Sequence, residues 1–221
     1  MKTLARQIAE AALAIKAVKL QPDDPFTWAS GYKMPIYNDN RLFLFYPEYR
    51  RLICEGFAGT IKKYGIPCDI VAGTPTAGIP HGMLLADTLG KPFIYPRKQQ
   101  KDHGMLNKIE GVPHPDKLAG KHVVMIEDLI STGGSSVEAL ETVRAAGAVV
   151  DTCLSIFSYG FQKAQDAFDR IGASYRSLIV LDDLIGVVEA AGYFSSEQLE
   201  LLREWKQSPF TWGERFTEPE A

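Results

Sequence analysis

Apolar residues recur at helical spacing near the start of the chain, at Leu4, Ile8, Ala12 and Ile15. This spacing of three or four positions predicts an amphipathic helix over residues 3–18. A second helix is predicted to begin at Pro47, since proline suits the first turn of a helix, and to run to about Tyr64, before the helix-ending Gly65. The segment between the two helices is rich in aromatic and turn residues, which predicts short extended pieces.

Beyond residue 65 the pattern changes to short, continuous apolar runs that alternate with helical stretches. The runs predict strands at residues 68–74, 92–98, 122–128, 149–159 and 174–181. The stretches between them predict helices at residues 78–90, 135–147 and 161–172. Strands that are apolar throughout are typical of a parallel sheet covered by helices on both faces, so the predicted fold class is α/β. Residues 99–117 are polar and show no periodicity, which predicts a long loop.

With 221 residues and 46% hydrophobic content, the chain can bury one sizeable core. We expect one domain in three parts, which are the N-terminal helices at residues 1–65, the α/β core at 66–181 and two C-terminal helices at 182–221. The expected N-caps of these last two helices are Asp182 and either Ser195 or Ser196.

The formal net charge of −3 does not favour binding to nucleic acid or to an anionic membrane. No run of 18 apolar residues occurs, so no membrane-spanning helix is predicted. The chain has three cysteines, Cys54, Cys68 and Cys153, and their spacing is not that of metal ligands. An odd number of cysteines without such spacing indicates reduced thiols in a cytoplasmic protein. The expected structural histidines, with satisfied hydrogen bonds, are His81, His114 and His122.

The segment VVMIEDLISTGGSS, residues 123–136, carries the clearest chemical signal. An apolar strand leads to two adjacent carboxylates, Glu127 and Asp128, and a turn of hydroxyl and glycine residues then leads into a helix. In an open parallel sheet, ligands bind beyond the carboxyl ends of the strands. The backbone N–H groups of such a turn and the helix N-terminus together make a phosphate cradle. The carboxylates would repel a phosphate, and they suit the vicinal hydroxyls of a ribose instead.

Two other phosphate-binding motifs, GxxxxGK[ST] and GxGxxG, are absent. The plain alternative is an ordinary strand, turn and helix with an acidic turn, but two unpaired acids at a buried strand end are costly unless something binds them. The segment resembles the motif with which type I phosphoribosyltransferases bind phosphoribosyl pyrophosphate (PRPP). That resemblance implies that Glu127 and Asp128 hold the ribose hydroxyls and that the loop holds the 5′-phosphate.

A basic cluster opens the polar loop within YPRKQQKDHG, residues 95–104. It is either a solvated run of charge or a lid that neutralises a pyrophosphate leaving group. The cluster resembles the RK-x-x-K-x-H-G signature of orotate phosphoribosyltransferases. The PRPP-binding residues implied by the two resemblances are Arg97, Lys98, Lys101, His103, Glu127, Asp128, Leu129, Ile130, Ser131, Thr132, Gly133, Gly134 and Ser135. The catalytic residues implied are Lys101, His103 and Asp128.

Residues 28–39, WASGYKMPIYND, resemble the S-G-x-K-S-P hood motif of the same family. The segment GTPTAGIP, residues 73–80, fits the family's pyrophosphate loop, and its Pro75–Thr76 bond is the candidate for a strained cis peptide. Some family members have a lysine at the position of Ala77 and an arginine at the position of Tyr159. The residues implied to contact orotate are Lys33, Ser131 and Tyr159.

The resemblance implies a type I phosphoribosyltransferase fold, in which a small hood from the N-terminal segment and the C-terminal helices joins the central parallel sheet. The implied reaction transfers the phosphoribosyl group of PRPP to orotate and yields orotidine 5′-monophosphate and pyrophosphate. Mg²⁺ is the implied cofactor, held mainly by PRPP and water with no direct protein ligand. The implied assembly is a homodimer with shared active sites, and the aromatic run that could form its interface is Phe43, Phe45 and Tyr46. Two alternatives stay open: transfer to another base, and a PRPP-sensing regulator without catalysis.

Overall fold

A six-stranded sheet forms the centre of the computed structural model, which describes residues 2–28, 31–97 and 108–216. Its strands are β5 (Ile70–Gly73), β6 (Phe93–Pro96), β7 (Ile109–Glu110), β8 (His122–Ile130), β9 (Val149–Ser158) and β10 (Ser174–Val180). They lie in the order β10-β9-β8-β5-β6-β7, and every pair is parallel except β6 with β7. The predicted parallel sheet is therefore confirmed. The short antiparallel β7 was not predicted, because two residues are too few to show a periodicity.

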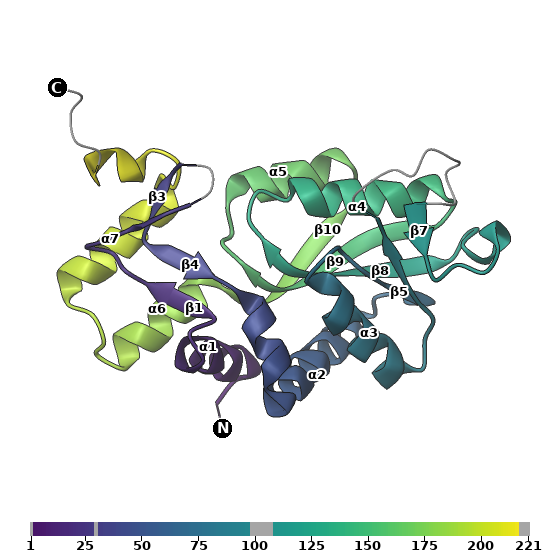
Figure 1. Ribbon diagram of the computed structural model, residues 1–221, viewed down its shortest axis with the longest axis horizontal. Coiled ribbons are helices and arrows are strands. Elements are labelled where there is room, and N and C mark those ends of the chain that lie inside the picture. The colour runs from purple at the N-terminus through teal and green to yellow at the C-terminus, as the bar shows by residue number, and fades with distance from the viewer. Residues whose placement is uncertain (1, 29–30, 98–107, 217–221) are drawn as a thin grey trace.

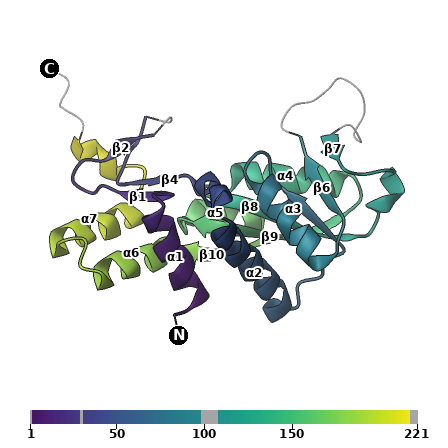
Figure 2. The ribbon, with the colours of Figure 1, turned by 60° about the horizontal axis from the view of Figure 1, so that its bottom comes forward.

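Helices cover both faces of the sheet, with β8 near its middle (Figures 1 and 2). The helices of one face are α1 (Leu4–Ala14), α2 (Pro47–Tyr64) and α3 (Gly78–Leu89), and those of the other are α4 (Gly134–Ala145) and α5 (Gln162–Arg170). Successive side chains of β8 alternate between the two layers. Val124 and Ile126 join the core beneath α1–α3, whereas Val123 and Met125 join the core beneath α4 and α5. This double burial explains why the strand is apolar throughout.

The two ends of the chain come together beside the sheet, at the left of Figure 1. We call this part the hood. Its elements are β1 (Val18–Leu20), β2 (Phe26–Thr27), β3 (Lys33–Met34), β4 (Ile36–Asn38), η1 (Asn40–Phe45), α6 (Leu181–Ala190), α7 (Ser196–Gln207) and η4 (Trp212–Phe216). The buried Trp205 of α7 donates a hydrogen bond from Nε1 to Sδ of Met34, 3.0 Å away. The short extended pieces and the two C-terminal helices are as predicted. The division of the chain at residues 65 and 181 stays a prediction.

Three local predictions need correction. The first helix ends at Ala14 rather than near residue 18, because Lys16 turns the chain with a φ of 59° before Val18 enters β1. Ser195 is confirmed as the N-cap of α7, but Asp182 lies inside α6, where Asp183 accepts from the backbone N–H of Val180. Among the described residues, neither ring nitrogen of the buried His81 has a hydrogen-bond partner, so its hydrogen bonds are not satisfied there as expected.

None of the helices in the described ranges is long and apolar enough to cross a lipid bilayer.

Candidate active site

The segment predicted to bind a phosphorylated ribose lies where β8 ends against the hood. The strand runs two residues further than predicted, to Ile130, and α4 begins at Gly134 after a bend at residues 131–133. Gly133 caps the helix with a φ of 79°, a value that disfavours any residue with a side chain. The first backbone N–H groups of α4 have no acceptor within the helix, so they can bind an anion. The predicted turn and helix start are thus present, and phosphate binding there stays a prediction.

Glu127 is almost fully buried, with 6% of its surface exposed. Its Oε1 accepts from the Thr74 hydroxyl at 2.6 Å and from the Asp128 backbone N–H at 3.0 Å, and its Oε2 accepts from the Ser136 hydroxyl at 3.0 Å. The pKa of Glu127 is raised to about 7, mainly by burial; the Thr74 hydroxyl opposes the rise and the nearby Asp128 carboxyl adds to it. This side chain therefore titrates close to neutral pH.

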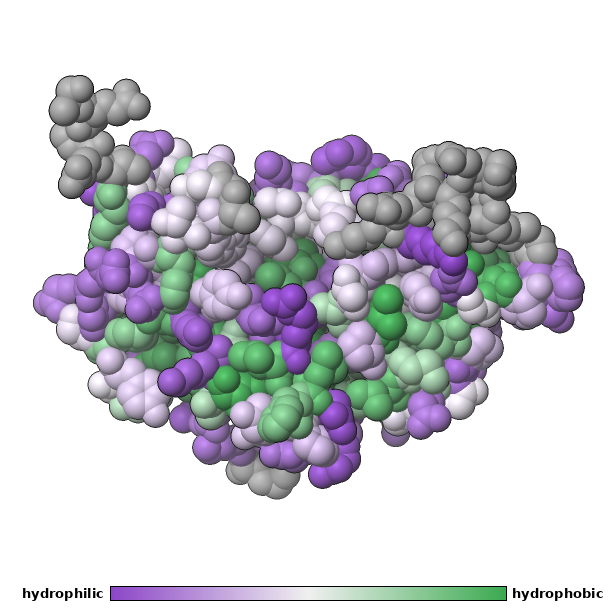
Figure 3. Space-filling view, in the orientation of Figure 1, coloured by the Kyte–Doolittle hydropathy of each residue, from purple (hydrophilic) through white to green (hydrophobic). Residues whose placement is uncertain are grey.

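Asp128 lies half-buried on the side of the strand that meets the hood. The buried Asn40 donates from Nδ2 to the backbone oxygen of Asp128 at 2.7 Å and so ties η1 to the end of β8. The Asp128 charge contributes to the raised pKa values of two neighbouring groups. For Arg41 the main cause is its hydrogen bond with Asp39, and for Tyr159 it is burial. The molecular surface is hollowed near the middle of the view in Figure 3, between the hood and the sheet.

A tight loop follows β5 and lies against β8. The backbone N–H of Thr74 donates to the Ile126 oxygen at 2.9 Å, and the Gly78 N–H donates to the Thr74 oxygen at 3.0 Å. The Pro75–Thr76 peptide bond is cis, as predicted. A Cβ on Gly78 would lie against the Ile126 oxygen and the Thr74 hydroxyl, so the sequence needs glycine there. This loop, residues 74–77, is the segment predicted to bind pyrophosphate, and that role stays a prediction.

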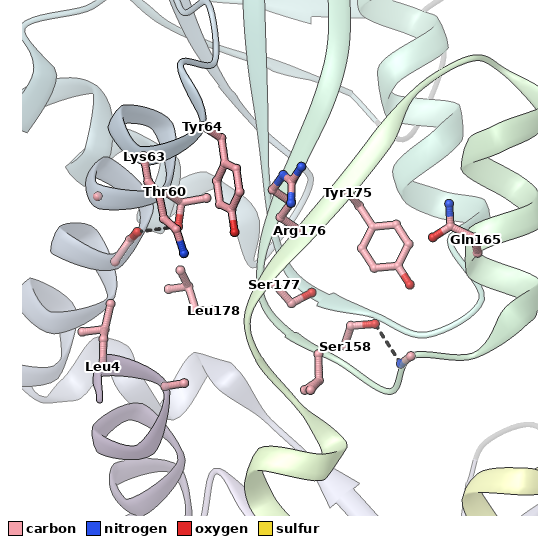
Figure 4. A pocket seen from close by; sticks show the side chains of 15 residues that line it. Leu4, Thr60, Lys63, Tyr64, Ser158, Gln165, Tyr175, Arg176, Ser177 and Leu178 are labelled. Carbon is pink, nitrogen blue, oxygen red and sulfur yellow. Dashed lines mark hydrogen bonds between the residues drawn. The ribbon is translucent and has the colours of Figure 1, made fainter. Parts of the chain in front are cut away.

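A cavity of about 200 Å³ lies between this loop, the end of β6 and the start of α4. Its lining residues are Thr74, Pro75, Pro96, Arg97, Glu127, Ser135, Glu138, Ala139 and Thr142. A larger hollow of about 560 Å³ lies along the edge strand β10, where Arg176 stacks on the ring of Tyr64 (Figure 4). Its lining includes neither carboxylate of β8 and none of residues 131–135, so the smaller cavity is the better candidate.

Arg97 points to the same end of the sheet but is paired within the chain. Its guanidinium forms an ion pair with Glu110 of β7, and its backbone N–H donates to the Lys108 oxygen at 2.7 Å. The other basic residues assigned to the lid, Lys98, Lys101 and His103, lie outside the described residues. Within the described ranges, no three His, Cys, Asp or Glu side chains gather into a metal-binding group.

The predicted orotate contacts have three different environments. Lys33 lies in β3 of the hood, where its backbone and Cβ pack against Gly213, and Ser131 follows β8 directly. Tyr159 is only 1% exposed, and its ring stacks on Phe161 with 5.2 Å between centroids. Burial and the Asp128 charge raise its pKa. Tyr159 is thus part of the core, and its contact with orotate stays a prediction.

The prediction that the aromatic run forms an interface is wrong for one of its three residues. Phe43 is fully buried, because it packs edge-on against Tyr49 of α2 within the core of its own chain. Phe45 is 82% exposed and Tyr46 is half-buried. The sequence could not separate them, since a 3₁₀ helix of six residues buries only part of an aromatic run.

Known proteins resemble this chain in sequence over nearly its full length. Residues 48–187 match the phosphoribosyl transferase domain family. An orotate phosphoribosyltransferase from Porphyromonas gingivalis is 45% identical over 96% of this chain and 100% of its own length. One from Listeria monocytogenes is 46% identical over 96% of this chain and 99% of its own length.

Solved structures share the fold. The crystal structure of orotate phosphoribosyltransferase from Aeropyrum pernix matches with a TM-score of 0.71 and 26% identity, covering 85% of this chain and 99% of that chain. Leishmania donovani UMP synthase matches with a TM-score of 0.76 and 28% identity over 92% of this chain, which spans 42% of that protein.

The family match covers more than half of the chain and includes the β8 carboxylates and residues 129–135. It shows that this chain belongs to the phosphoribosyltransferases. The identity of 45% over nearly the full length of its relatives places it, within that class, in the orotate phosphoribosyltransferase family. Type I fold and family were both predicted from the motifs. Thr74, Asn40 and Glu110 were not singled out, because single polar residues outside a motif carry no signal in one sequence.

Proposed function

We propose that this chain transfers the phosphoribosyl group of PRPP to orotate, forming orotidine 5′-monophosphate and pyrophosphate. The observation that carries the proposal is the pair of carboxylates at the end of β8, directly before a backbone cradle for phosphate. An adjacent phosphate site and ribose site match a sugar phosphate, and the relatives that are 45% and 46% identical are orotate phosphoribosyltransferases.

The residues divide the work by subsite. The cradle, from Leu129 to Ser135, holds the 5′-phosphate, and the carboxylates of Glu127 and Asp128 hold the ribose hydroxyls. Positive charge develops on the ribose ring as the bond to pyrophosphate breaks, and the Asp128 carboxylate stabilises it. The pyrophosphate loop and the cations of Arg97, Lys98, Lys101 and His103 stabilise the negative leaving group. A nitrogen of orotate, positioned by Lys33, Ser131 and Tyr159, attacks the anomeric carbon.

Mg²⁺ fits this arrangement as a partner of the substrate. The ion needs no direct protein ligand, since PRPP oxygens and water hold it. When bound, the ion neutralises the charge of the diphosphate. The residues of the chain then orient the ribose and exclude water from the anomeric carbon.

The proposed assembly is a homodimer whose lid serves the neighbouring site. Large apolar side chains exposed on η1 and α3 support an interface there, and they are Leu42, Phe45, Met83 and Leu84. The proposed location is the cytoplasm, where thiols stay reduced, and the chain has three cysteines, all of which are free.

A spectrophotometric assay tests the function directly. With PRPP and Mg²⁺, the protein should consume orotate and release an equal amount of pyrophosphate. Adenine, hypoxanthine and uracil should be poor substrates under the same conditions. Turnover of a purine base without turnover of orotate would contradict the assignment, and binding of PRPP without turnover of any base would favour the regulator instead.

A further inference from the structure

The carboxylate of Glu127 joins a loop and a helix N-terminus that are far apart in the sequence. Thr74, the first residue of the pyrophosphate loop, donates its hydroxyl to Oε1 at 2.6 Å. Ser136, in the first turn of α4, donates its hydroxyl to Oε2 at 3.0 Å. Both hydroxyl-bearing residues are almost fully buried, at 2% and 1% exposure. Glu127 therefore links the loop expected to hold pyrophosphate to the cradle expected to hold the 5′-phosphate.

The geometry leaves Glu127 little capacity for a ligand. Oε1 already accepts from the Asp128 N–H as well as from Thr74. Each carboxylate oxygen accepts about two hydrogen bonds, so the free position is on Oε2. An acid buried to this degree is retained only where hydrogen bonds offset its desolvation. Here two of the donors come from the loop after β5 and from the first turn of α4, and this sets the position of both relative to the strand.

We propose that Thr74 and Ser136 are positioning residues, which hold Glu127 and thereby fix the pyrophosphate loop relative to the phosphate cradle. The inference rests on the proposed function, because it assigns the two loops to the two ends of PRPP. In PRPP, the diphosphate and the 5′-phosphate lie on opposite sides of the anomeric carbon. The distance between the pyrophosphate loop and the phosphate cradle therefore sets the alignment of the bond between the anomeric carbon and the diphosphate, which breaks in the reaction. Neither hydroxyl needs to touch the substrate.

The titratable and charged groups around Glu127 determine how its hydrogen bonds to Thr74 and Ser136 should respond to pH. Asp128 is adjacent on β8, Cys153 lies on β9, and Arg97 and Glu138 line the same cavity from β6 and α4. The Thr74 hydroxyl lowers the pKa of Glu127, opposing burial and Asp128. Removal of that hydroxyl should therefore raise the pKa and move the acidic limb of the pH profile to higher pH. A threonine whose hydroxyl does not act on Glu127 would leave the limb in place.

The test compares Thr74→Val, which removes the hydroxyl at nearly constant volume, with Thr74→Ser, which keeps it. We expect Thr74→Val to lower kcat about tenfold to a hundredfold, the scale for small displacements of reacting groups, with little change in KM for orotate. Thr74→Ser should restore most of kcat. In a Glu127→Gln background, Thr74→Val should add less than about a twofold loss, since the partner of the hydroxyl has changed. Ser136→Ala should follow the same pattern.

Two controls remove a similar hydroxyl elsewhere. Thr60→Val in α2 and Ser174→Ala in β10 each lose one hydrogen bond to a backbone oxygen and should keep normal activity. PRPP affinity, measured by calorimetry without any base, separates this inference from the choice of base. Thr74→Val should bind PRPP at least several-fold more weakly even if the acceptor is not orotate. Normal PRPP affinity, an unmoved acidic limb, or full additivity with Glu127→Gln would each overturn the proposal.

Discussion

At the scale of single residues, adjacent acids in β8 have different surroundings. Glu127 is buried and hydrogen-bonded on both oxygens, whereas Asp128 is half-buried and faces the hood. Successive residues of a strand point to opposite faces, which accounts for the difference. Asp128 is therefore the more accessible of the two acids, and Glu127 is the one that links neighbouring elements of the protein.

Asp128→Asn should lower turnover on the order of a hundredfold or more while leaving the fold intact. The substitution keeps the shape of the side chain but removes the charge that stabilises the cationic ribose ring. Steady-state assays with orotate, together with a circular dichroism spectrum, measure both effects. Glu127→Gln should show a milder loss. Near-normal turnover of Asp128→Asn would contradict its catalytic role.

Two buried groups should give the free energy of unfolding opposite dependences on pH. Burial raises the pKa of Glu127 from 4.5 to about 7, so between these values the native state holds a proton that the unfolded chain has lost, and stability falls as pH rises. Burial lowers the pKa of His81 from 6.5 to about 4, so stability falls as pH drops through that window. Each contribution is at most about 3 kcal/mol.

Urea unfolding at pH 5 and at pH 7 separates the two contributions. Glu127→Gln should lose stability on acidification more steeply than the wild type, because only the His81 effect remains. His81→Leu should do the reverse, since the remaining Glu127 effect favours the native state at lower pH. Identical pH dependences in all three proteins would show that neither group titrates differently in the folded and unfolded states.

At the scale of elements, the hydrophobic pattern predicted the sheet because its strands are buried on both faces, as β8 shows with Val123, Val124, Met125 and Ile126. The cradle and the cis Pro75–Thr76 bond were predictable because each belongs to a motif. The links between elements were not. The contact of Asn40 with Asp128 and that of Thr74 with Glu127 join residues 88 and 53 positions apart, and one sequence contains no signal for such pairs.

Gly78→Ala should test how tightly the pyrophosphate loop packs on β8. The added Cβ would lie against the Ile126 oxygen and the Thr74 hydroxyl, so we expect a loss of about 1–3 kcal/mol in stability and a marked loss of activity. Gly59→Ala in α2 is the matched control, because its Cβ would meet no atom within 4 Å. That control should be unchanged or slightly more stable, as alanine favours the helix. Equal urea midpoints for the two variants would refute the packing argument.

At the scale of the whole molecule, the candidate site lies at the carboxyl edge of the sheet, and Asn40 of the hood is tied to the same edge through the backbone oxygen of Asp128 (Figure 1). The described part of the chain supplies the cradle, the pyrophosphate loop and Arg97, which is paired with Glu110. Phe45 of η1 and Met83 of α3 are exposed, and both elements pack against α2. A second copy of the chain that covered these side chains would lie beside the carboxyl edge of the sheet. A second chain could therefore supply further cations to the site.

Complementation decides whether the lid serves the neighbouring subunit. Lys101→Ala impairs only the lid and Asp128→Asn only the ribose site, so each variant alone should be nearly inactive. In a mixed dimer with a shared lid, one site has both defects and the other has neither. Random mixing makes about half of the dimers mixed, so about a quarter of all sites should be intact. If the lid served its own subunit, every site would carry one defect.

The two variants are therefore unfolded and refolded together, and orotate consumption is assayed beside each variant refolded alone. No recovery of activity, with mixed dimers verified by mass spectrometry, would refute the shared site.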